Sequence, residues 1–389
     1  MKKYSLEKFK EKQKNKRMFK YSLCILIVVF ILIITSLYIA NKDFKSFIDT
    51  YILRREVRES NSNSIAIDTD GVSLIYAYDK NIATYTGGKV VFYDTHGKES
   101  GNIEIAFSKP IANSKEKYLV IGDLGAQKLC LISNNELLWQ KDVEGKISKV
   151  SVNANGYVAV STTGTTYESM VMIYNAKGEL QFTKYISTYV LDAQISKDNK
   201  YLALAEADNS KISPSSKVEL ISIDKAVSDS ENATLNTYQG ETGEVITGIK
   251  FQDKGKVLCC FDSYIVRLEE KNAERIYDYS DLTSYIDVNM NNEFVRIDKE
   301  KSSVFKSDYR LKITNSNKTD KTFIIEGSLK SLKAKDKIVA LNLGSEVVFL
   351  NSNAWMIKKY TSTQDIKDVV ISDKLGLIIY GEKIDIVKL

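Results

Sequence analysis

The chain contains a single histidine, His96, in the sequence Asp94-Thr95-His96-Gly97. A Ser-His-Asp or Cys-His catalytic arrangement needs an imidazole that is buried and oriented by its neighbours, and a hairpin tip is a poor place for one. A zinc site with several histidine ligands is excluded by the count. His96 is therefore interpreted as an exposed turn residue, and no catalytic residue is assigned.

Acidic residues give weak signals for metal binding and for glycoside hydrolysis. The sequence Asp68-Thr69-Asp70-Gly71 has the opening spacing of a calcium loop, but Asp79 stands where the closing Glu is needed. The 50 acidic residues allow many carboxylate pairs, so a glycosidase pair stays open, and no spacing singles one out. No nucleotide-binding loop occurs. We therefore expect no metal and no cofactor.

The four cysteines do not form a disulfide framework. Cys24 lies in an apolar run near the N-terminus, and Cys130, Cys259 and Cys260 lie in strand-like apolar segments. Neighbouring side chains of a strand point to opposite faces, which disfavours a disulfide between the last two. All three are interpreted as small buried hydrophobic residues.

Polar residues gather in two long loops, 206–217 and 225–243. Long loops on a regular scaffold are where binding residues concentrate, although insertions are also tolerated there without a function. We predict that the two loops help form one partner-binding face. The candidate partner-binding residues are Asp208, Asn209, Lys211, Ser213, Asp229, Glu231, Asn236 and Tyr238.

These loops interrupt a repeat that begins near Ser64. The hairpin KVSVNANGYVAV recurs, and the counterparts of its Val152 are spaced by 40, 43, 56, 39, 42 and 39 residues: Ala112, Val152, Ile195, Phe251, Met290, Leu332 and Ile371. A second hairpin, such as KVVFYDTHGKES, completes each unit. A period near 40 with about four strands predicts an all-β protein, a β-propeller, with eight blades or alternatively seven.

The two ends of the repeat region complement each other. The last unit, DVVISDKLGLIIYGEKIDIVKL, supplies three strands. Ile65-Ala66-Ile67 could supply the fourth, which would close the ring and remove exposed strand edges.

An uncharged run, Tyr21 to Ala40, precedes the repeats. Its length fits a membrane-spanning helix, with a cleaved signal peptide or a buried core helix as alternatives. Residues 1–20 carry nine positive and two negative charges, against five and four in residues 41–60. This asymmetry predicts a cytoplasmic N-terminus and an extracytoplasmic C-terminal domain.

The predicted organisation has four parts. They are a basic cytoplasmic tail (1–20), a transmembrane helix (21–40), an amphipathic juxtamembrane helix or linker (41–63) and the propeller (64–389). Phe44, Phe47, Ile48, Tyr51 and Ile52 give the third part an apolar stripe, typical of a stalk or of a self-association helix. Residues 21–389 carry 46 basic and 48 acidic residues, so their net charge is close to zero. A nearly neutral domain lacks the positive charge that binds a polyanion, which excludes a nucleic-acid partner.

The chain resembles a family of single-pass, membrane-anchored β-propellers of unknown function from Gram-positive bacteria. The resemblance rests on the basic tail, the single span and repeats such as VMIYNAKGELQF and ISKDNKYLALA. More distantly, the hairpins resemble quinoprotein-like and WD40-like repeats. Only Trp139 and Trp355 suggest the tryptophan of quinoprotein repeats, and neither follows a Thr-Gly pair. The resemblance implies an exported propeller and transfers no catalytic residue.

We therefore predict a non-enzymatic binding or scaffolding module on the extracytoplasmic side of the cell membrane. Its partners would be the cytoplasmic membrane and a protein of the cell envelope. The alternatives are an envelope enzyme, either a hydrolase or a quinoprotein-like protein, and a ligand-sensing module. An acidic or arginine cluster lining the central channel would favour the enzyme, and an apolar plug with an aromatic patch on one rim would favour binding.

Overall fold

The N-terminal helix α1 spans Lys2–Ala40. The computed structural model describes residues 2–41, 44–45, 48, 52, 56–58, 62–164, 166–210, 212–252, 255–301, 307–315 and 317–389. In this part of the chain, Met18–Ala40 is the one helical segment long and apolar enough to cross a membrane, and none of it is buried. Its length and composition fit an anchor or a signal sequence equally. Much of 41–63, including Phe47 and Tyr51, lies outside the described residues, so the juxtamembrane helix stays a prediction.

Most of the rest of the described chain folds into eight small sheets, the blades of a β-propeller, which are antiparallel except where β1 pairs with β30 in parallel. This confirms the predicted fold and the larger of the two blade numbers. Blade 1 consists of β3 (Leu74–Tyr78), β4 (Asn81–Thr86), β5 (Lys89–Tyr93) and β6 (Glu99–Glu104), and blade 2 of β7 (Pro110–Lys115), β8 (Tyr118–Asp123), β9 (Lys128–Ser133) and β10 (Glu136–Asp142). Blade 3 consists of β11 (Lys146–Val152), β12 (Val158–Thr163), β13 (Ser169–Tyr174) and β14 (Leu180–Ile186), and blade 4 of β15 (Tyr189–Ile195), β16 (Tyr201–Asp208), β17 (Ser215–Ser222) and β18 (Thr234–Gln239).

Blades 5 to 8 follow the same plan, with one strand added to each of the last two from the N-terminal side. Blade 5 consists of β19 (Ile246–Phe251), β20 (Val257–Phe261), β21 (Tyr264–Leu268) and β22 (Ala273–Asp278), and blade 6 of β23 (Thr283–Asp287), β24 (Glu293–Lys301), β25 (Ser307–Asn315) and β26 (Asp320–Ile325). Blade 7 consists of β27 (Ser331–Lys335), β28 (Ile338–Asn342), β29 (Glu346–Asn351) and β30 (Met356–Thr361) with β1 (Glu56–Arg58). Blade 8 consists of β31 (Asp368–Ile371), β32 (Leu375–Ile379) and β33 (Lys383–Lys388) with β2 (Asn63–Ala66).

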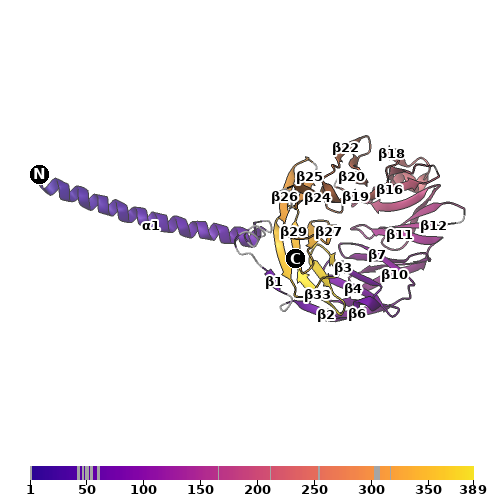
Figure 1. Ribbon diagram of the computed structural model, residues 1–389, viewed down its shortest axis with the longest axis horizontal. Coiled ribbons are helices and arrows are strands. Elements are labelled where there is room, and N and C mark those ends of the chain that lie inside the picture. Colours follow the sequence, from indigo (N-terminus) through magenta and orange to yellow (C-terminus); the bar gives the residue numbers. More distant parts are fainter. Residues whose placement is uncertain are drawn as a thin grey trace. The chain divides into compact units, whose positions relative to one another are not determined.

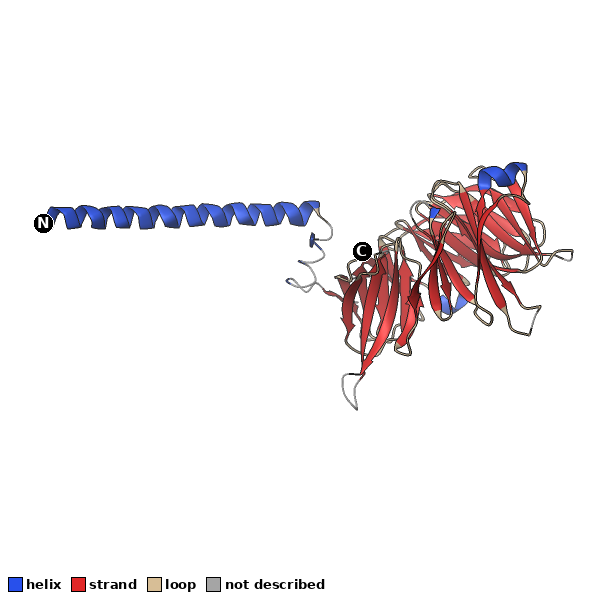
Figure 2. Cartoon of the chain, turned by 90° about the horizontal axis from the view of Figure 1, so that it is seen from above, coloured by secondary structure: helices blue, strands red, loops and turns tan. Residues whose placement is uncertain are grey.

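The first strand of each blade lies nearest the centre of the ring. First strands of consecutive blades contact one another, for example β3 with β7, β7 with β11 and β11 with β15. Figure 1 shows the labels β3, β7, β11, β19 and β27 around the middle. Turned by 90°, the ring is seen from its edge, with loops at both ends of the strands (Figure 2). We call the face at which the first strands begin the upper face, and the face at which they end the lower face.

The ring is closed by strands from both ends of the propeller region. β2 pairs with β33 in antiparallel register, with Ser64 opposite Asp385 and Ile65 opposite Ile384. Ile65 is buried in an apolar cluster with Ile384 and Ile386, which confirms the predicted closure. Gly97 lies against this strand so closely that a Cβ there would stand 2.4 Å from the carbonyl oxygen of Ser64. No other residue type fits at that contact without moving β2.

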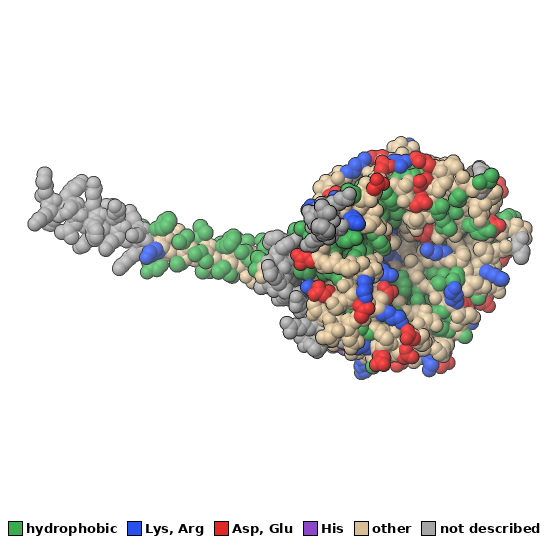
Figure 3. Space-filling model, in the orientation of Figure 1, with side chains coloured by type: hydrophobic (Ala, Val, Ile, Leu, Met, Phe, Trp, Pro, Cys, Tyr) green, Lys and Arg blue, Asp and Glu red, His purple; other side chains and the backbone are tan. Residues whose placement is uncertain are grey.

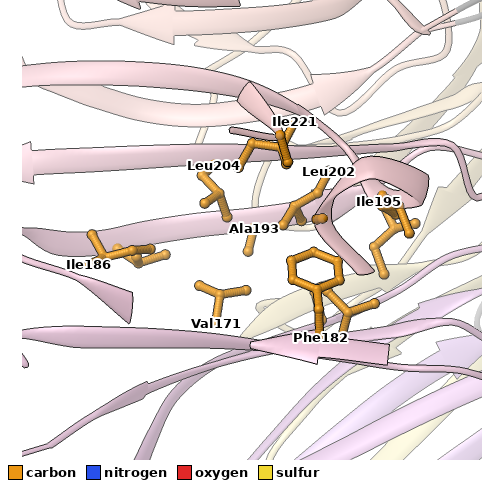
Figure 4. Packing of buried hydrophobic residues seen from close by; sticks show 14 residues of the cluster. Val171, Phe182, Ile186, Ala193, Ile195, Leu202, Leu204 and Ile221 are labelled. Atoms are coloured by element: carbon orange, nitrogen blue, oxygen red, sulfur yellow. The ribbon is translucent and has the colours of Figure 1, made fainter. Parts of the chain in front are cut away.

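Aliphatic side chains fill the space between neighbouring blades. Figure 4 shows the cluster between blades 3 and 4, where Val171, Phe182 and Ile186 face Leu202, Leu204 and Ile221. Cys259 packs in the corresponding cluster between blades 4 and 5, and Cys260 in the one between blades 5 and 6. Both are free thiols, as is Cys130, so the prediction of buried hydrophobic cysteines is confirmed.

Tight turns use a carboxylate or amide to hold backbone amides. Asp94 Oδ1 accepts hydrogen bonds from the backbone N–H groups of His96 and Lys98, which makes His96 an exposed member of that turn. Asp68 caps a short 3-10 helix, η3 (Thr69–Gly71), and Asp70 pairs with Lys367. The acidic residues of the calcium-like sequence therefore have structural roles here.

Candidate functional site

Strand register brings several exposed side chains to the upper face of blades 3 and 4. In blade 3, Tyr185 of β14 lies opposite Met170 near the end of its strand. In blade 4, Tyr189 lies opposite Ala207, and Asp208 opposite Ser215. The last residues of β14 and β16 and the first residues of β15 and β17 therefore share one end of the ring. The described residues of three connections, 164 and 166–168, 187–188, and 209–210 with 212–214, lie at this same end.

Four large side chains at this end of the two blades, Tyr167, Tyr185, Tyr189 and Leu191, are each between 38% and 50% exposed. The rings of Tyr167 and Tyr185 stack with their centroids 4.4 Å apart. A hydrogen bond to the Glu168 carboxylate raises the pKa of the Tyr189 hydroxyl, which links this side chain to the same connection. We call these four residues the upper patch.

Leu191 is set apart by its position in β15. The pairing of β15 with β16 shifts between Val190 and Asp192, so Leu191 is the extra residue of a β-bulge. The described strands β11, β19 and β23 have bulges at Ser148, Thr247 and Ser284, near the same end. Each of those hydroxyls donates a hydrogen bond to a carbonyl of the neighbouring strand at 3.1 Å. Blade 4 places an exposed leucine where these three blades place a structural hydroxyl.

A polar pocket of about 370 Å³ lies beside the upper patch, lined by blade 4 and by the connections that precede and follow it. Its lining includes Thr188, Glu206, Asp208, Ser213 and Lys217. Glu206 is only 1% exposed, and its Oε1 has no hydrogen-bond partner among the described residues. The other oxygen, Oε2, accepts a hydrogen bond from Thr188 at 2.5 Å and lies 3.2 Å from Lys217 Nζ. A carboxylate that lines the pocket therefore has one buried oxygen without a hydrogen-bond partner in the described part of the chain.

Two buried carboxylates beside this pocket have opposite electrostatic environments. Burial raises the pKa of Glu206, and the nearby charge of Glu219 adds to that effect. Burial acts in the same direction on Glu219, but hydrogen bonds and charge from Lys217 and Lys184 outweigh it and lower its pKa. Lys217 lies 2.5 Å from Glu219, so its strongest contact is with the carboxylate that does not line the pocket. Glu206 is the carboxylate available to a bound group.

The predicted site residues are divided by the fold. Asp208 and Ser213 line the pocket, Asn209 lies in the same connection, and Lys211 lies outside the described residues. Asp229 and Glu231 follow helix α3 (Ile223–Ser228), at the opposite end of β17. Because β17 runs from one face to the other, Asp229 and Glu231 lie at the end opposite to Asp208 and Ser213. The end of the second predicted range, Gln239, Gly240 and Thr242, lines the same pocket as Asp208 and Ser213. Whether these residues bind a partner stays a prediction.

The remaining two candidates have contacts within the ring. Asn236 donates a hydrogen bond from Nδ2 to the Glu269 carbonyl, and Tyr238 packs edge-on against Phe261. Both lie in β18 and join blade 4 to blade 5. The residues of the upper patch and Glu206 were missed by sequence reasoning. One signal was present in the sequence. Ser148 and Thr247 stand four residues before the recurring repeat positions Val152 and Phe251, whereas Leu191 stands four residues before Ile195 in blade 4.

In the space-filling view, hydrophobic side chains are exposed among charged ones over the part of the ring where β11, β12 and β16 lie (Figures 1 and 3). The middle of the ring is hollowed in the same view. Exposed tyrosine and leucine next to a hydrogen-bonding pocket are features of protein-binding surfaces, in which aromatic anchors carry much of the binding energy.

Several solved β-propellers are similar to this chain. BamB from Moraxella catarrhalis aligns with a TM-score of 0.51 and 10% identity, covering 84% of this chain and 98% of its own. Sqt1 of Chaetomium thermophilum, solved bound to the N-terminus of the ribosomal protein L10, aligns with a TM-score of 0.54 and 9% identity, covering 84% and 100%. At these identities the likeness shows the fold alone. No curated protein matches the sequence. The model of a family of unknown function (DUF5711) matches residues 33–389.

Proposed function

Because this chain belongs to that family of unknown function, we propose a role from the surface it presents: a non-enzymatic module that binds a protein partner through its upper face. The observation that carries the proposal is the upper patch, and above all Leu191. At the equivalent bulges of three other blades, Ser148, Thr247 and Ser284 each donate a hydrogen bond. Leu191 cannot donate this bond, and it exposes apolar surface to water. A partner that covers the patch accounts for the lost hydrogen bond and for the exposed apolar surface.

The partner is expected to combine an apolar or aromatic side chain with a hydrogen-bond donor. The first would pack on the Tyr167–Tyr185 pair and Leu191. The second would reach Glu206 Oε1 in the adjoining pocket. A lysine, an N-terminal amine or an amide has the required chemistry. The related Sqt1 fold, solved with an N-terminal protein segment bound, gives a precedent for such a ligand on a propeller.

The proposed location is the outer side of the cytoplasmic membrane of a Gram-positive bacterium. Met18–Ala40 would serve as a retained, single-pass anchor, and the basic tail would keep the N-terminus in the cytoplasm. The partner would then be a protein of the cell envelope. Scaffolding rather than catalysis is the proposed role.

The experiment is site-specific photocrosslinking in intact cells. A photoreactive residue is placed at Tyr185, at the upper end of β14, or at Leu180, at the lower end of the same strand and similarly exposed. We expect a defined protein adduct from Tyr185 that Leu180 does not give. Equal adducts from both positions, or none from Tyr185, would refute the proposed face.

One observation favours the alternative of an envelope hydrolase. Glu206 combines burial, a raised pKa and a pocket, which is the environment of a general acid. The second carboxylate that glycoside hydrolysis requires would have to be Asp208, which also lines the pocket. Release of reducing sugar from wall glycan by the purified protein, lost in Glu206→Gln, would replace the binding proposal with this one.

A further inference from the structure

A second cavity, of about 660 Å³, lies where the central channel opens on the lower face. It is lined by the last residues of several first strands and by the turns that follow them. Among the described residues, five lysines line it against three acids: Lys115, Lys197, Lys250, Lys335 and Lys337 against Glu116, Asp336 and Asp373. The mouth is neither an apolar plug nor an acidic cluster, so neither channel feature predicted for the two functions is present there.

Two of these lysines come from distant blades to one carboxylate, and a third lies beside it in sequence. Lys115 of β7 and Lys250 of β19 both pair with Oδ1 of Asp336, the latter at 3.1 Å. Lys335 of β27 instead donates a hydrogen bond to the Ser114 hydroxyl at 2.9 Å and lies over the Tyr76 ring. The third ammonium is therefore held by uncharged groups.

Asp336 is fixed in place by its backbone. It has a positive φ of 51°, its N–H donates to the Asn289 carbonyl, and its own carbonyl accepts from the Asn291 N–H, both at 2.8 Å. Burial alone would raise its pKa, but the charges of Lys250 and Lys115 and their hydrogen bonds lower it to about 2. Asp336 therefore stays ionised and neutralises one of the lysines around it.

Among the described residues that line the cavity, the positive charge of the lysines exceeds the negative charge of the acids. Burial lowers the pKa of the Lys250 ammonium, and the charges of Lys115 and Lys335 lower it further, against the effect of Asp336. Like charges held together in a partly dehydrated cavity repel one another, and a bound anion relieves that repulsion. Amide side chains, such as Asn113 and Gln194, add polar groups to the wall.

We propose that the lower mouth of the channel binds a small, doubly charged anion, and that its class is phosphate. The charge of the lining, five lysines against three acids, matches a dianion. Ammonium groups arriving from several directions suit a tetrahedral phosphate, whereas flat carboxylates are matched better by the fork of arginine. This site is independent of the upper patch, because it lies at the other end of the first strands.

The test uses full-length protein in detergent micelles and inorganic phosphate at constant ionic strength. Calorimetric titration should show saturable phosphate binding that Lys335→Gln weakens at least about tenfold. Lys335→Gln leaves both ion pairs of Asp336 intact. Lys333→Gln is the matched control, because Lys333 lies on the same strand, pairs with Asp368 and does not line the cavity. Its affinity should equal that of the parent.

Two comparisons complete the test. In the parent protein, phosphate should raise the melting temperature more than chloride does at equal ionic strength, a readout that needs no variant. Equal effects of the two salts, or equal phosphate affinity in Lys335→Gln and the parent, would overturn the site. Succinate is the second probe, and tighter binding of succinate than of phosphate would overturn the assignment to phosphate.

Discussion

Leu191 in blade 4 occupies the bulge that Ser148 occupies in blade 3. Ser148 donates a hydrogen bond to the Ser161 carbonyl across the bulge, and Leu191 leaves the corresponding carbonyl of Ala205 without that donor. The two blades otherwise share the same strand plan. The difference concentrates apolar surface on one sector of the upper face, and it provides a direct way to separate binding from folding.

Leu191→Ser should restore the missing hydrogen bond and remove part of the upper patch. We expect unfolding free energy to stay the same or rise by about 1 kcal/mol, the usual net value of one hydrogen bond. The Tyr185 photocrosslink should fall in the same variant. Ser148→Ala is the control, with a loss of about 1 kcal/mol and an unchanged crosslink. A stable Leu191→Ser protein that captures its partner at full yield would contradict the role of the patch.

Glu206→Gln and Glu219→Gln should change stability in opposite directions at neutral pH. The pKa of Glu206 is raised in the folded state, so its contribution is fully present below the usual value of 4.5 and is lost as pH rises. Its amide variant should therefore be more stable than the parent at pH 7, and the gain should disappear in acid.

Glu219 is the matched control for that variant. Its pKa is lowered, so its stabilising effect is present above the usual 4.5 and is lost as pH falls, and Glu219→Gln should destabilise the protein at pH 7. Denaturant unfolding at two pH values measures both. Changes of the same sign in the two variants at pH 7 would argue against the described charge arrangement.

Ring closure should depend on the buried side chain of Ile65. Ile65→Ala removes apolar contacts with β33 and should cost about 2–4 kcal/mol. Ile324→Ala changes the same side chain where it is 57% exposed and should stay within about 0.5 kcal/mol of the parent. Truncation after Thr363 removes β31, β32 and β33 and should be more severe than either. Thermal melting followed by circular dichroism is the measurement, and a truncated protein that melts like the parent would contradict closure by the C-terminus.

Asp336 should stabilise the fold in a pH-dependent way. Its folded pKa of about 2 lies below the usual 3.8, so its contribution is complete above about pH 4 and is lost as pH falls towards 2. Near pH 6 the parent should exceed Asp336→Asn by about 2 kcal/mol. Unfolding curves at pH 6, 4 and 3 check the trend. A gap between the two proteins that widened in acid would show that the sign is wrong.

The proposed topology predicts which residues an external protease reaches. On wall-stripped cells, protease should digest the chain beyond residue 41 and spare the tail, because the positive charges of residues 1–20 hold it inside. A cytoplasmic protein that is cut only after lysis is the control for intact cells. Full protection of the propeller in such cells would reverse the orientation.

The sequence by itself determined the repeat, the number of strands per blade, the closing strand and the apolar helix. These features are local: alternation of apolar residues along a strand, Asn, Asp and Gly in turns, and an uncharged run of sufficient length are all visible within a few tens of residues. Ile65 could be assigned to the ring because the last repeat lacked one strand. Its burial then follows from closure.

Only the tertiary structure decided which residues share a face. Asp208 and Asp229 are close in sequence, yet β17 carries the chain from the upper to the lower face between Ser215 and Ser222. Conversely, Lys115 and Asp336 are 221 residues apart and pair at the lower mouth of the channel. The physical reason is that residues at equivalent positions of different repeats lie on the same face of a propeller, however far apart they are along the chain. A side chain's partners are therefore fixed by the closure of all eight blades.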